Sequence, residues 1–300
     1  MDGLLYVDKP AGITSHDVVG VVRRAARSRR VGHAGTLDPF ATGLLVLGIG
    51  NCTRLLPYII GEPKVYDAVI RFGSETDTDD ATGSETIERP LPAFGDDSGR
   101  ASLNAAIATL TGRIAQIPPA YSAKHVDGER AYALARRGEA VSLPPVDITV
   151  HGWAILEVTS ERVCARITCG GGTYVRALAR DLGRALASAA HCEELRRISS
   201  GPAHVDDATP FAALTPGAIE NCTVFLHSPL EALGDIATES LDDIGVLALS
   251  QGRAIAATQP GAMVAFLREP RAMDARVLGI GVRTTGERWQ PRVVLLGSEA

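Results

Sequence analysis

The chain has 300 residues and a formal net charge of −5 at pH 7, and 45% of its residues are hydrophobic while 22% are charged. This composition is typical of a globular protein with one large or two modest domains, and it excludes disordered, collagen-like and coiled-coil classes. No apolar run approaches the roughly 18 residues of a membrane span. The N-terminus lacks the basic segment of a secretory signal. The five cysteines include no CxxC pair. These features predict a cytoplasmic protein with reduced thiols, without a zinc site or a disulfide framework.

Hydrophobic periodicity, capping residues and turn signals divide the N-terminal part of the chain into strands and one helix. Thr14 and Ser15 are both good N-caps for a helix whose apolar side consists of valines. Along 64–72 apolar and polar residues alternate, as in a half-buried strand. The predicted elements are, in chain order, a strand at 4–7, a helix from Thr14 or Ser15 to about Arg27, a glycine-punctuated loop at 32–43, and strands at 44–48 and 64–72.

An acidic run at 75–80 follows these strands. It faintly resembles a calcium loop, but Ala81 and Thr82 stand where that loop needs a ligand and a glycine, so we exclude calcium. We expect the run to be a solvated loop. The predicted elements after it are a helix at 102–110, an irregular loop at 116–128, a helix at 129–137, strands near 147–157 and 163–169, a helix from Tyr174 to about Ala189, and a short helix near Glu193.

The composition changes after residue 210, where prolines and short apolar patches indicate a linker. We therefore predict a larger domain over 1–210, a linker over 211–240 and a small β-rich module over 241–300. The elements expected in this module are a short helix ending near Gln251 and Gly252, and strands at 263–267, 276–282 and 292–296.

Positive charge is concentrated in parts of the chain although its total is negative. Residues 1–60 carry seven Lys and Arg against four Asp and Glu, and residues 161–200 carry the same numbers, whereas residues 61–100 carry four against ten. Five arginines fall within residues 23–30, more than a helix C-terminus needs to complement its dipole. Such clusters are candidate contacts for nucleic-acid phosphates, and a solvated helix face is the alternative.

The densest candidate functional segment is the loop at 32–43. Its glycines permit positive φ angles and a close approach to a ligand, and Pro39 keeps Asp38 out of the helical conformation. From the residues alone Asp38 has three interpretations: a nucleophile, a general base, or a turn residue that caps the next amides. No second carboxylate lies near it in sequence to form a glycosidase pair, and there is no HExxH motif for a metal and no GxxxxGK[ST] motif for a nucleotide.

The loop reads Gly32-His33-Ala34-Gly35-Thr36-Leu37-Asp38-Pro39-x-Ala41-Thr42-Gly43. It closely resembles the signature of the tRNA pseudouridine-55 synthases, the TruB family. Other segments within residues 3–201 resemble the remaining motifs of that family in the right order. They are Asp8–Ser15, Lys64–Tyr66 with Gly73 and Thr76–Asp80, Gln116–Lys124 with Gly128, Gly172–Arg176 with Asp181–Gly183, and Leu195–Arg197 with Ser200–Gly201. One departure is visible: Gly170 and Gly171 stand where the family usually has a polar pair such as Ser-Lys, which affects one expected phosphate contact.

The resemblance implies an α+β fold, with a mixed or antiparallel β-sheet core flanked by helices and loops, and a small PUA-like β-barrel at 241–300. It also implies that the catalytic domain over 1–210 has RNA-binding excursions near 73–142. It implies that the protein isomerises uridine 55 in the T loop of tRNA to pseudouridine. In this reaction the N1–C1′ bond breaks, the base turns, and it rejoins the sugar through C5, so no metal, nucleotide or other cofactor is expected. Direct attack at C1′ and participation after loss of the C2′ proton are both open routes.

The resemblance also implies roles for individual residues. Asp38 is the expected nucleophile, Arg176 the cation that keeps it ionised in an enclosed pocket, and Tyr66 the catalytic aromatic that stacks on the flipped uracil. The expected substrate-binding residues are His33, Tyr66, Tyr174, Leu195 and Lys9, with Lys9 weighed first as a support behind the loop and second as a phosphate contact. Arg180 and Arg184, one and two turns beyond Arg176, are interpreted as a solvated helix face.

The expected partner is the T arm of tRNA, from which the target base must be flipped out at a cost of a few kcal/mol. Arginines at 23–30, 176–184 and 196–197 are the expected phosphate contacts, and we expect a monomer with no obligatory protein partner and no membrane association. One alternative is a guide-RNA-dependent relative, which a long basic C-terminal tail would favour in place of the Gly297–Ala300 end. Another is a non-catalytic RNA-folding chaperone in which Asp38 is incidental.

Overall fold

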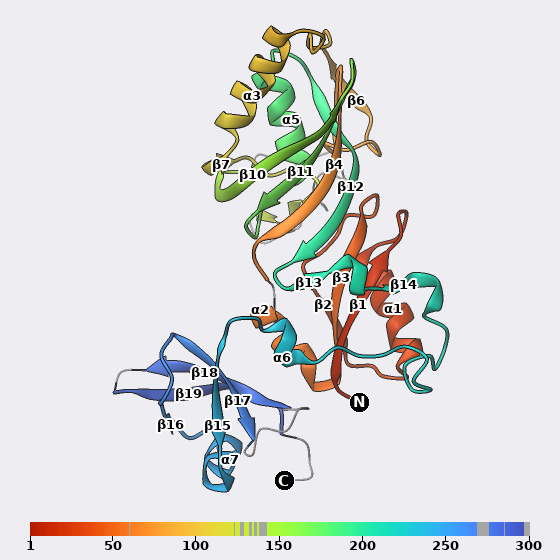
Figure 1. Ribbon diagram of the computed structural model, residues 1–300. Coiled ribbons are helices and arrows are strands. Elements are labelled where there is room, and N and C mark those ends of the chain that lie inside the picture. Colours follow the sequence, from red (N-terminus) through yellow and green to blue (C-terminus); the bar gives the residue numbers. More distant parts are fainter. Residues whose placement is uncertain are drawn as a thin grey trace. The chain divides into compact units, whose positions relative to one another are not determined.

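The computed structural model describes residues 1–59, 61–122, 124–126, 129–131, 134, 137, 143–268, 276–284 and 286–296. The chain forms two compact units, whose helices and strands are labelled in Figure 1. Unit 1 consists of Met1–Asp38, Leu44–Gly61 and Gly201–Ala300, and unit 2 consists of Pro39–Gly43 and Glu62–Ser200. Both units are therefore assembled from segments that are far apart in sequence.

The N-terminal part of unit 1 is a small mixed sheet with one long helix. Its elements are β1 (Gly3–Lys9), α1 (Ser15–Ala25), β2 (Val31–Ala34), β3 (Thr42–Ile49) and β14 (Thr209–Pro210). Strand β1 lies between β14, which runs parallel to it, and β3, and β3 also pairs with β2 in antiparallel fashion. Thr14 is the N-cap of α1 and forms a capping box with Asp17, while the valines of the helix contribute its buried side. The predicted strands and the predicted cap are confirmed here.

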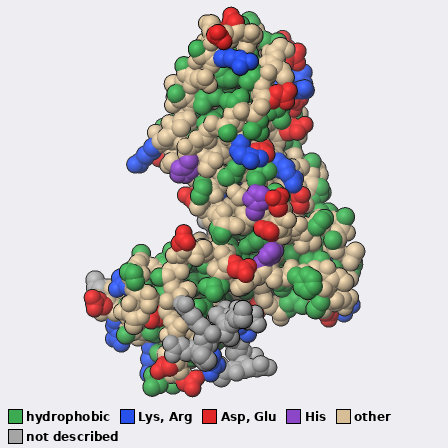
Figure 2. All heavy atoms as spheres, viewed as in Figure 1, with side chains coloured by type: hydrophobic (Ala, Val, Ile, Leu, Met, Phe, Trp, Pro, Cys, Tyr) green, Lys and Arg blue, Asp and Glu red, His purple; other side chains and the backbone are tan. Residues whose placement is uncertain are grey.

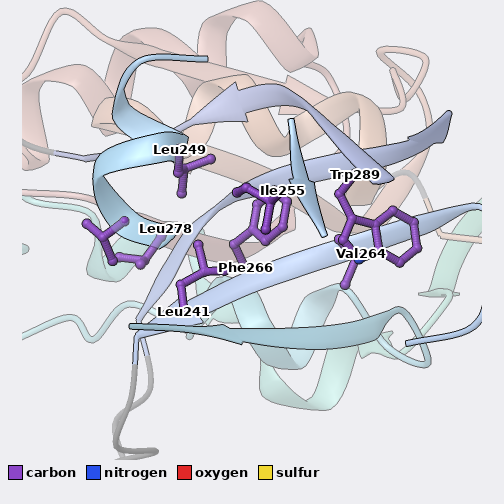
Figure 3. Close-up of a cluster of buried hydrophobic side chains, with 8 residues drawn as sticks. Leu241, Leu249, Ile255, Val264, Phe266, Leu278 and Trp289 are labelled. Carbon is purple, nitrogen blue, oxygen red and sulfur yellow. The ribbon is translucent and has the colours of Figure 1, made fainter. Parts of the chain in front are cut away.

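The C-terminal part of unit 1 is a five-stranded sheet in the order β15-β17-β18-β19-β16 with one helix. Its elements are β15 (Ala237–Leu241), α7 (Asp243–Ser250), β16 (Ile255–Ala256), β17 (Met263–Arg268), β18 (Val277–Thr284) and β19 (Arg288–Val294). Figure 3 shows its core, in which Phe266 and Trp289 are fully buried among aliphatic side chains such as Leu249. The predicted β-rich module is present, and β15 is a strand that the sequence analysis did not predict. Short helices elsewhere in unit 1 include η1 (Gly50–Leu55), α2 (Leu56–Ile59) and α6 (Pro229–Ala232).

Unit 2 is an antiparallel sheet in the order β12-β4-β11-β10-β7. Its main elements are β4 (Lys64–Phe72), α3 (Asp97–Thr109), β7 (Gly112–Gln116), β10 (Val146–Val158), β11 (Arg162–Cys169), α5 (Val175–Ala185) and β12 (Ala190–Ser200). Two small ribbons complete it, β5 (Ser74–Thr76) with β6 (Glu85–Glu88), and β8 (His125–Val126) with β9 (Glu129–Arg130). Helix α5 packs against β12 and β4, and α3 contacts α5. Thr42 and Gly43, at the start of β3, pair in parallel with Arg196 and Arg197 of β12.

The alternation predicted for 64–72 is confirmed by the two faces of β4. Tyr66, Ala68, Ile70 and Phe72 are buried on one face. On the other face Arg166 donates two hydrogen bonds to Asp67, at 2.7 and 2.8 Å. On the face drawn in Figure 2, Lys and Arg side chains are interspersed with Asp and Glu. On this face the positive side chains therefore form no continuous basic surface.

Several predicted helices have other bounds in the structure, and the one predicted at 102–110 begins five residues earlier, as α3. The short helix near Glu193 is wrong, because that residue lies in β12, a strand paired along its length with β4. The helix predicted to end near Ala189 ends at Ala185, and Ala187 has a positive φ of 53°. The helix predicted at 129–137 falls mostly outside the described residues: its first two positions form β9, and the described residues Ala131 and Leu134 are helical. None of the described helices is long and apolar enough to span a membrane.

Candidate active site

Asp38 follows a residue whose backbone is held by a buried serine. The Ser15 hydroxyl, at the first residue of α1, accepts a hydrogen bond from Leu37 N at 2.9 Å and donates one to Leu37 O at 3.1 Å. Leu37 is itself buried, and Pro39 restricts the backbone on the other side of Asp38. The N-terminus of α1 therefore fixes the point at which Asp38 leaves the core of unit 1.

Lys9 supports the neighbouring turn from inside. Its side chain is 0% exposed, and its ammonium group donates hydrogen bonds to Pro10 O at 2.9 Å and to Ile13 O at 2.8 Å. Burial of a cation requires such acceptors, and here main-chain carbonyls provide them. This geometry favours the first of the two roles weighed for Lys9. His33 lies on β2 opposite Leu47, so unit 1 carries three of the candidate residues: Lys9, His33 and Asp38.

Unit 2 carries the other candidates, and its sheet brings two of them to one face. Tyr66 on β4 lies opposite Arg197 of β12, and Leu195 of β12 lies opposite Ala68 of β4. Both Tyr66 and Leu195 are buried, on the face of the sheet on which α5 packs. Leu195 belongs to a strand and not to the basic helix that the sequence suggested.

Tyr174 is the N-cap residue of α5, and a glutamine holds it. The Gln116 amide accepts a hydrogen bond from Tyr174 N at 2.9 Å and donates one to Tyr174 O at 3.0 Å. Tyr174 has no side-chain cap, so Gln116 serves the backbone at the start of the helix. The sequence analysis quoted Gln116 within a motif but assigned it no role. A buried amide that pairs with a single residue's N–H and C=O has no signature in local sequence.

Arg176 is 3% exposed and lies in the first turn of α5. Its guanidinium donates to Thr78 O at 2.7 Å and to Tyr121 O at 3.0 Å, and it lies 3.5 Å from Asp80 Oδ2. These contacts place a positive charge in a nearly dry environment, where charge–charge interactions are strong. Such a cation can keep a nearby carboxylate ionised.

The solvated helix face expected for Arg180 and Arg184 is wrong for Arg180, which is buried, whereas Arg184 is exposed and ion-paired. Arg180 is 7% exposed and donates to Asp79 Oδ2 at 2.8 Å, to Asp181 Oδ1 at 2.9 Å and to Ile117 O at 2.9 Å. Arg184 is about half exposed and binds Glu75 through two hydrogen bonds of 2.8 and 2.6 Å.

The acidic run at 75–80 is correspondingly not a solvated loop. Glu75, Asp79 and Asp80 are all buried and face the arginines of α5. Burial raises the pKa of Asp79 from 3.8 to about 6, although Arg180 and Arg176 act in the opposite direction. The acidic run and the arginines on α5 neutralise each other inside unit 2, and the expectation that Arg180 contacts phosphates at the surface fails for the same reason.

Arg197 is also buried, at 1% exposure, so it cannot be the surface phosphate contact expected of it. Its backbone pairs with Gly43, where a Cβ atom would lie 2.3 Å from Arg197 O and where φ is +96°. Only glycine fits this close approach of two strands. Burial, with the positive charge of Arg197 as a second cause, lowers the pKa of Lys64.

The departure from the family pattern at Gly170 and Gly171 has a structural counterpart. Gly171 N donates a hydrogen bond of 2.6 Å to Glu62 Oε1, and a Cβ atom at Gly171 would lie 2.4 Å from that oxygen. A side chain at this position would displace the Glu62 carboxylate.

Among the described residues, no group of three or more His, Cys, Asp and Glu is arranged to hold a metal ion.

Comparison with known proteins agrees with the motifs. Residues 23–175 match the model of the TruB family pseudouridylate synthase N-terminal domain. The chain is 43% identical over 305 residues to tRNA pseudouridine synthase B of Thermobifida fusca, with 99% of each chain covered. It is 43% identical over 288 residues to tRNA pseudouridine synthase B of Leifsonia xyli subsp. xyli, which covers 92% of this chain and 95% of the relative.

Solved structures show the same fold at lower identity. A chain of an H/ACA RNP bound to a substrate RNA containing 2′-deoxyuridine aligns with a TM-score of 0.71 at 20% identity, covering 99% of this chain and 86% of that chain. A chain of the archaeal box H/ACA sRNP Nop10-Cbf5 complex aligns with a TM-score of 0.70 at 20% identity, covering 99% and 87%. These likenesses confirm the predicted α+β fold with a mixed sheet. The family model and the relatives of nearly equal length together show that the chain belongs to the TruB family of pseudouridylate synthases.

Proposed function

We propose that this protein isomerises uridine 55 in the T loop of tRNA to pseudouridine, with Asp38 as the nucleophile. The observation that carries the proposal is the position of Asp38, the carboxylate of the family's signature loop, directly after Leu37, whose backbone the buried Ser15 hydroxyl holds through two hydrogen bonds. The named relatives, which are tRNA pseudouridine synthases B, support tRNA as the substrate. A rigid loop suits a nucleophile, because the attacking oxygen must be held in line with the sugar carbon.

The remaining candidate residues have distinct roles in this proposal. Arg176 keeps Asp38 ionised through its charge, and Tyr66 stacks on the flipped uracil and takes part in catalysis. Tyr174, Leu195 and His33 bind the substrate; an imidazole ring suits stacking against a nucleotide of the loop. Lys9 belongs to the substrate-binding set only indirectly: it holds the turn from Pro10 to Ile13, which precedes the helix whose first residue, Ser15, binds the backbone next to Asp38.

The proposal includes the organisation and setting of the protein. Residues 1–210 form the catalytic domain and 241–300 a PUA-like RNA-binding domain, and the linker predicted at 211–240 ends in β15, the first strand of the C-terminal sheet. The partner is the T-arm stem-loop of tRNA, and the protein acts as a monomer in the cytoplasm without a protein partner. Of the arginine clusters, residues 23–30 best suit phosphate contact, because all five of their arginines are exposed.

The experiment that tests the function compares wild type with Asp38→Asn and Asp38→Ala on a tRNA transcript, followed by tritium release from C5-labelled uridine. We expect both variants to lose isomerisation while they still bind the transcript, since the amide has the shape of the carboxylate but is not a nucleophile. Asp235→Asn, a change at an exposed carboxylate in the same unit, is the matched control and should keep the wild-type rate.

Each alternative gives a different result. Activity that appears only with an added guide RNA would favour the guide-dependent relative. Binding without product in the wild type would favour a chaperone. Turnover of Asp38→Asn within about ten-fold of wild type would remove Asp38 from the nucleophile role, since loss of a covalent nucleophile costs far more than this.

A further inference from the structure

Two arginines one helical turn apart bridge the same two segments of unit 2. Arg176 joins Thr78 O of the acidic run to Tyr121 O. Arg180 joins Asp79 of the same run to Ile117 O. The bridges are parallel, because residues four apart on a helix lie on the same face. Helix α5 thus connects the acidic run to the segment Gln116–Tyr121 twice.

The acidic run is fixed independently of these arginines. Cys192 N of β12 donates to Asp79 O at 3.0 Å, and Ala81 N donates to Cys192 O at 3.1 Å. Asp79 itself has a φ of 58°, which sets the direction of its side chain at a tight turn. The Asp79 carboxylate is therefore a fixed acceptor against which the Arg180 guanidinium is oriented.

The segment Gln116–Tyr121 is held to α5 by hydrogen bonds at three of its residues. It leaves the end of β7 without forming a further helix or strand up to Tyr121, and the Ile117 side chain is exposed. Gln116 pairs with Tyr174, the N-cap residue of α5, Ile117 O accepts from Arg180, and Tyr121 O accepts from Arg176. Position 121 provides one of the two carbonyls that hold the Arg176 guanidinium, so displacement of this segment would displace Arg176.

We infer that Arg180 and Asp79 are positioning residues for the reaction: Asp79 orients Arg180, and Arg180 holds the segment Gln116–Tyr121 so that Arg176 stays in place. The inference rests on the role proposed above for Arg176. Arg180 is suited to this task because a guanidinium presents five donors in a rigid plane, and here three of its nitrogens bind three separate partners. A lysine keeps the charge but cannot reach Asp79 and Ile117 O in that fixed geometry.

The test is Arg180→Lys in the full-length protein, measured by single-turnover isomerisation at saturating tRNA and by tRNA binding. We expect the single-turnover rate to fall about ten-fold, equivalent to about 1.4 kcal/mol, while the Kd for tRNA changes less than about two-fold. Asp79→Asn should lower the rate in the same way. The double variant should be no slower than Arg180→Lys alone, because both changes break one linkage.

Arg184→Lys is the matched control. Arg184 lies one turn further along α5 and also pairs with a buried carboxylate of the acidic run, but both of its hydrogen bonds go to Glu75 and neither goes to the segment Gln116–Tyr121. It should keep the rate within about two-fold of wild type. Melting temperatures of all variants, followed by circular dichroism, separate loss of position from loss of fold.

Three results would overturn the inference: a wild-type rate in Arg180→Lys, an equal loss in Arg184→Lys, or a loss confined to tRNA affinity. If Arg180→Lys does not fold, Asp79→Asn decides the matter, and an unchanged rate in that variant rejects the linkage. Failure of the proposed function is a separate outcome, because the wild type itself would then form no pseudouridine in the transcript.

Discussion

Replacing Asp79 with asparagine should change how the stability of the protein depends on pH. Burial raises the pKa of Asp79 to about 6 from 3.8, with Asp181 and Glu75 adding to the rise and Arg180 and Arg176 opposing it. Between these two values the native state binds more protons than the unfolded state, so the free energy of unfolding falls as the pH rises. The stabilising contribution is complete below about pH 4 and lost above about pH 6, and a rise of about two pKa units amounts to about 3 kcal/mol.

Asparagine carries no titrating proton, so the variant lacks this dependence. The free energy of unfolding of Asp79→Asn, relative to wild type, should therefore increase by about 3 kcal/mol from pH 4 to pH 7.5. Urea unfolding followed by circular dichroism at several pH values measures this difference, and Asp147→Asn, an exposed carboxylate of unit 2, serves as the control. A difference that stays constant with pH would refute the reasoning. A difference of opposite sign would show that the ion pair with Arg180 outweighs burial.

Three further changes test other parts of the structure. Ser15→Ala removes the hydroxyl that binds the backbone before Asp38 and should lower the free energy of unfolding by about 1–3 kcal/mol. The single-turnover rate should fall while the affinity for tRNA stays unchanged. A normal rate would show that the loop does not need this support. Gly43→Ala should lower the free energy of unfolding by at least about 2 kcal/mol, because Gly43 has a positive φ and lies close to Arg197 O. Gly152→Ala is the control and should lower it by less than about 1 kcal/mol, because there is open space around Gly152. Equal melting temperatures of the two variants would contradict this prediction. Phe266→Ala should lower the free energy of unfolding of the C-terminal sheet by about 3–5 kcal/mol. Hydrogen exchange should show this as a loss of amide protection in β15–β19, and full protection there would contradict a core centred on the Phe266 ring.

The sequence predicted those elements whose signal is local. Helix α1 carries its capping residues and its apolar side within eleven residues, and β4 alternates without interruption. The candidate residues from Lys9 to Leu195 were identified through motif resemblance, which depends on residue order and needs no knowledge of packing. What the sequence could supply was therefore the strands and helices with regular periods, and the identity of the candidate residues.

The missed features depend on partners that are distant in sequence. Strand β12 contains Glu193, Glu194 and Leu195, which favour helices, and its register with β4 shifts between Cys192 and Glu194, so the alternation that marks a strand is broken. Pairing with β4 overrides the local preference. Arg180 is buried because Asp79 lies opposite it, and a helix with regularly spaced arginines gives no local indication of a partner a hundred residues away.

The buried contacts of the Arg180 guanidinium limit which substitutions the family can accept at positions 79 and 180. An asparagine or alanine at 79 leaves a guanidinium buried beside one carboxylate instead of two, and loss of Arg180 leaves Asp79 buried without its cation. Removing one partner of a buried pair costs about 3–5 kcal/mol, a large share of the stability of an ordinary domain. Lineages should therefore pass through single changes at these positions rarely, and positions 79 and 180 should be exchanged as a pair. An alignment of relatives would show this as covariation between two columns that are far apart in the chain and adjacent in space.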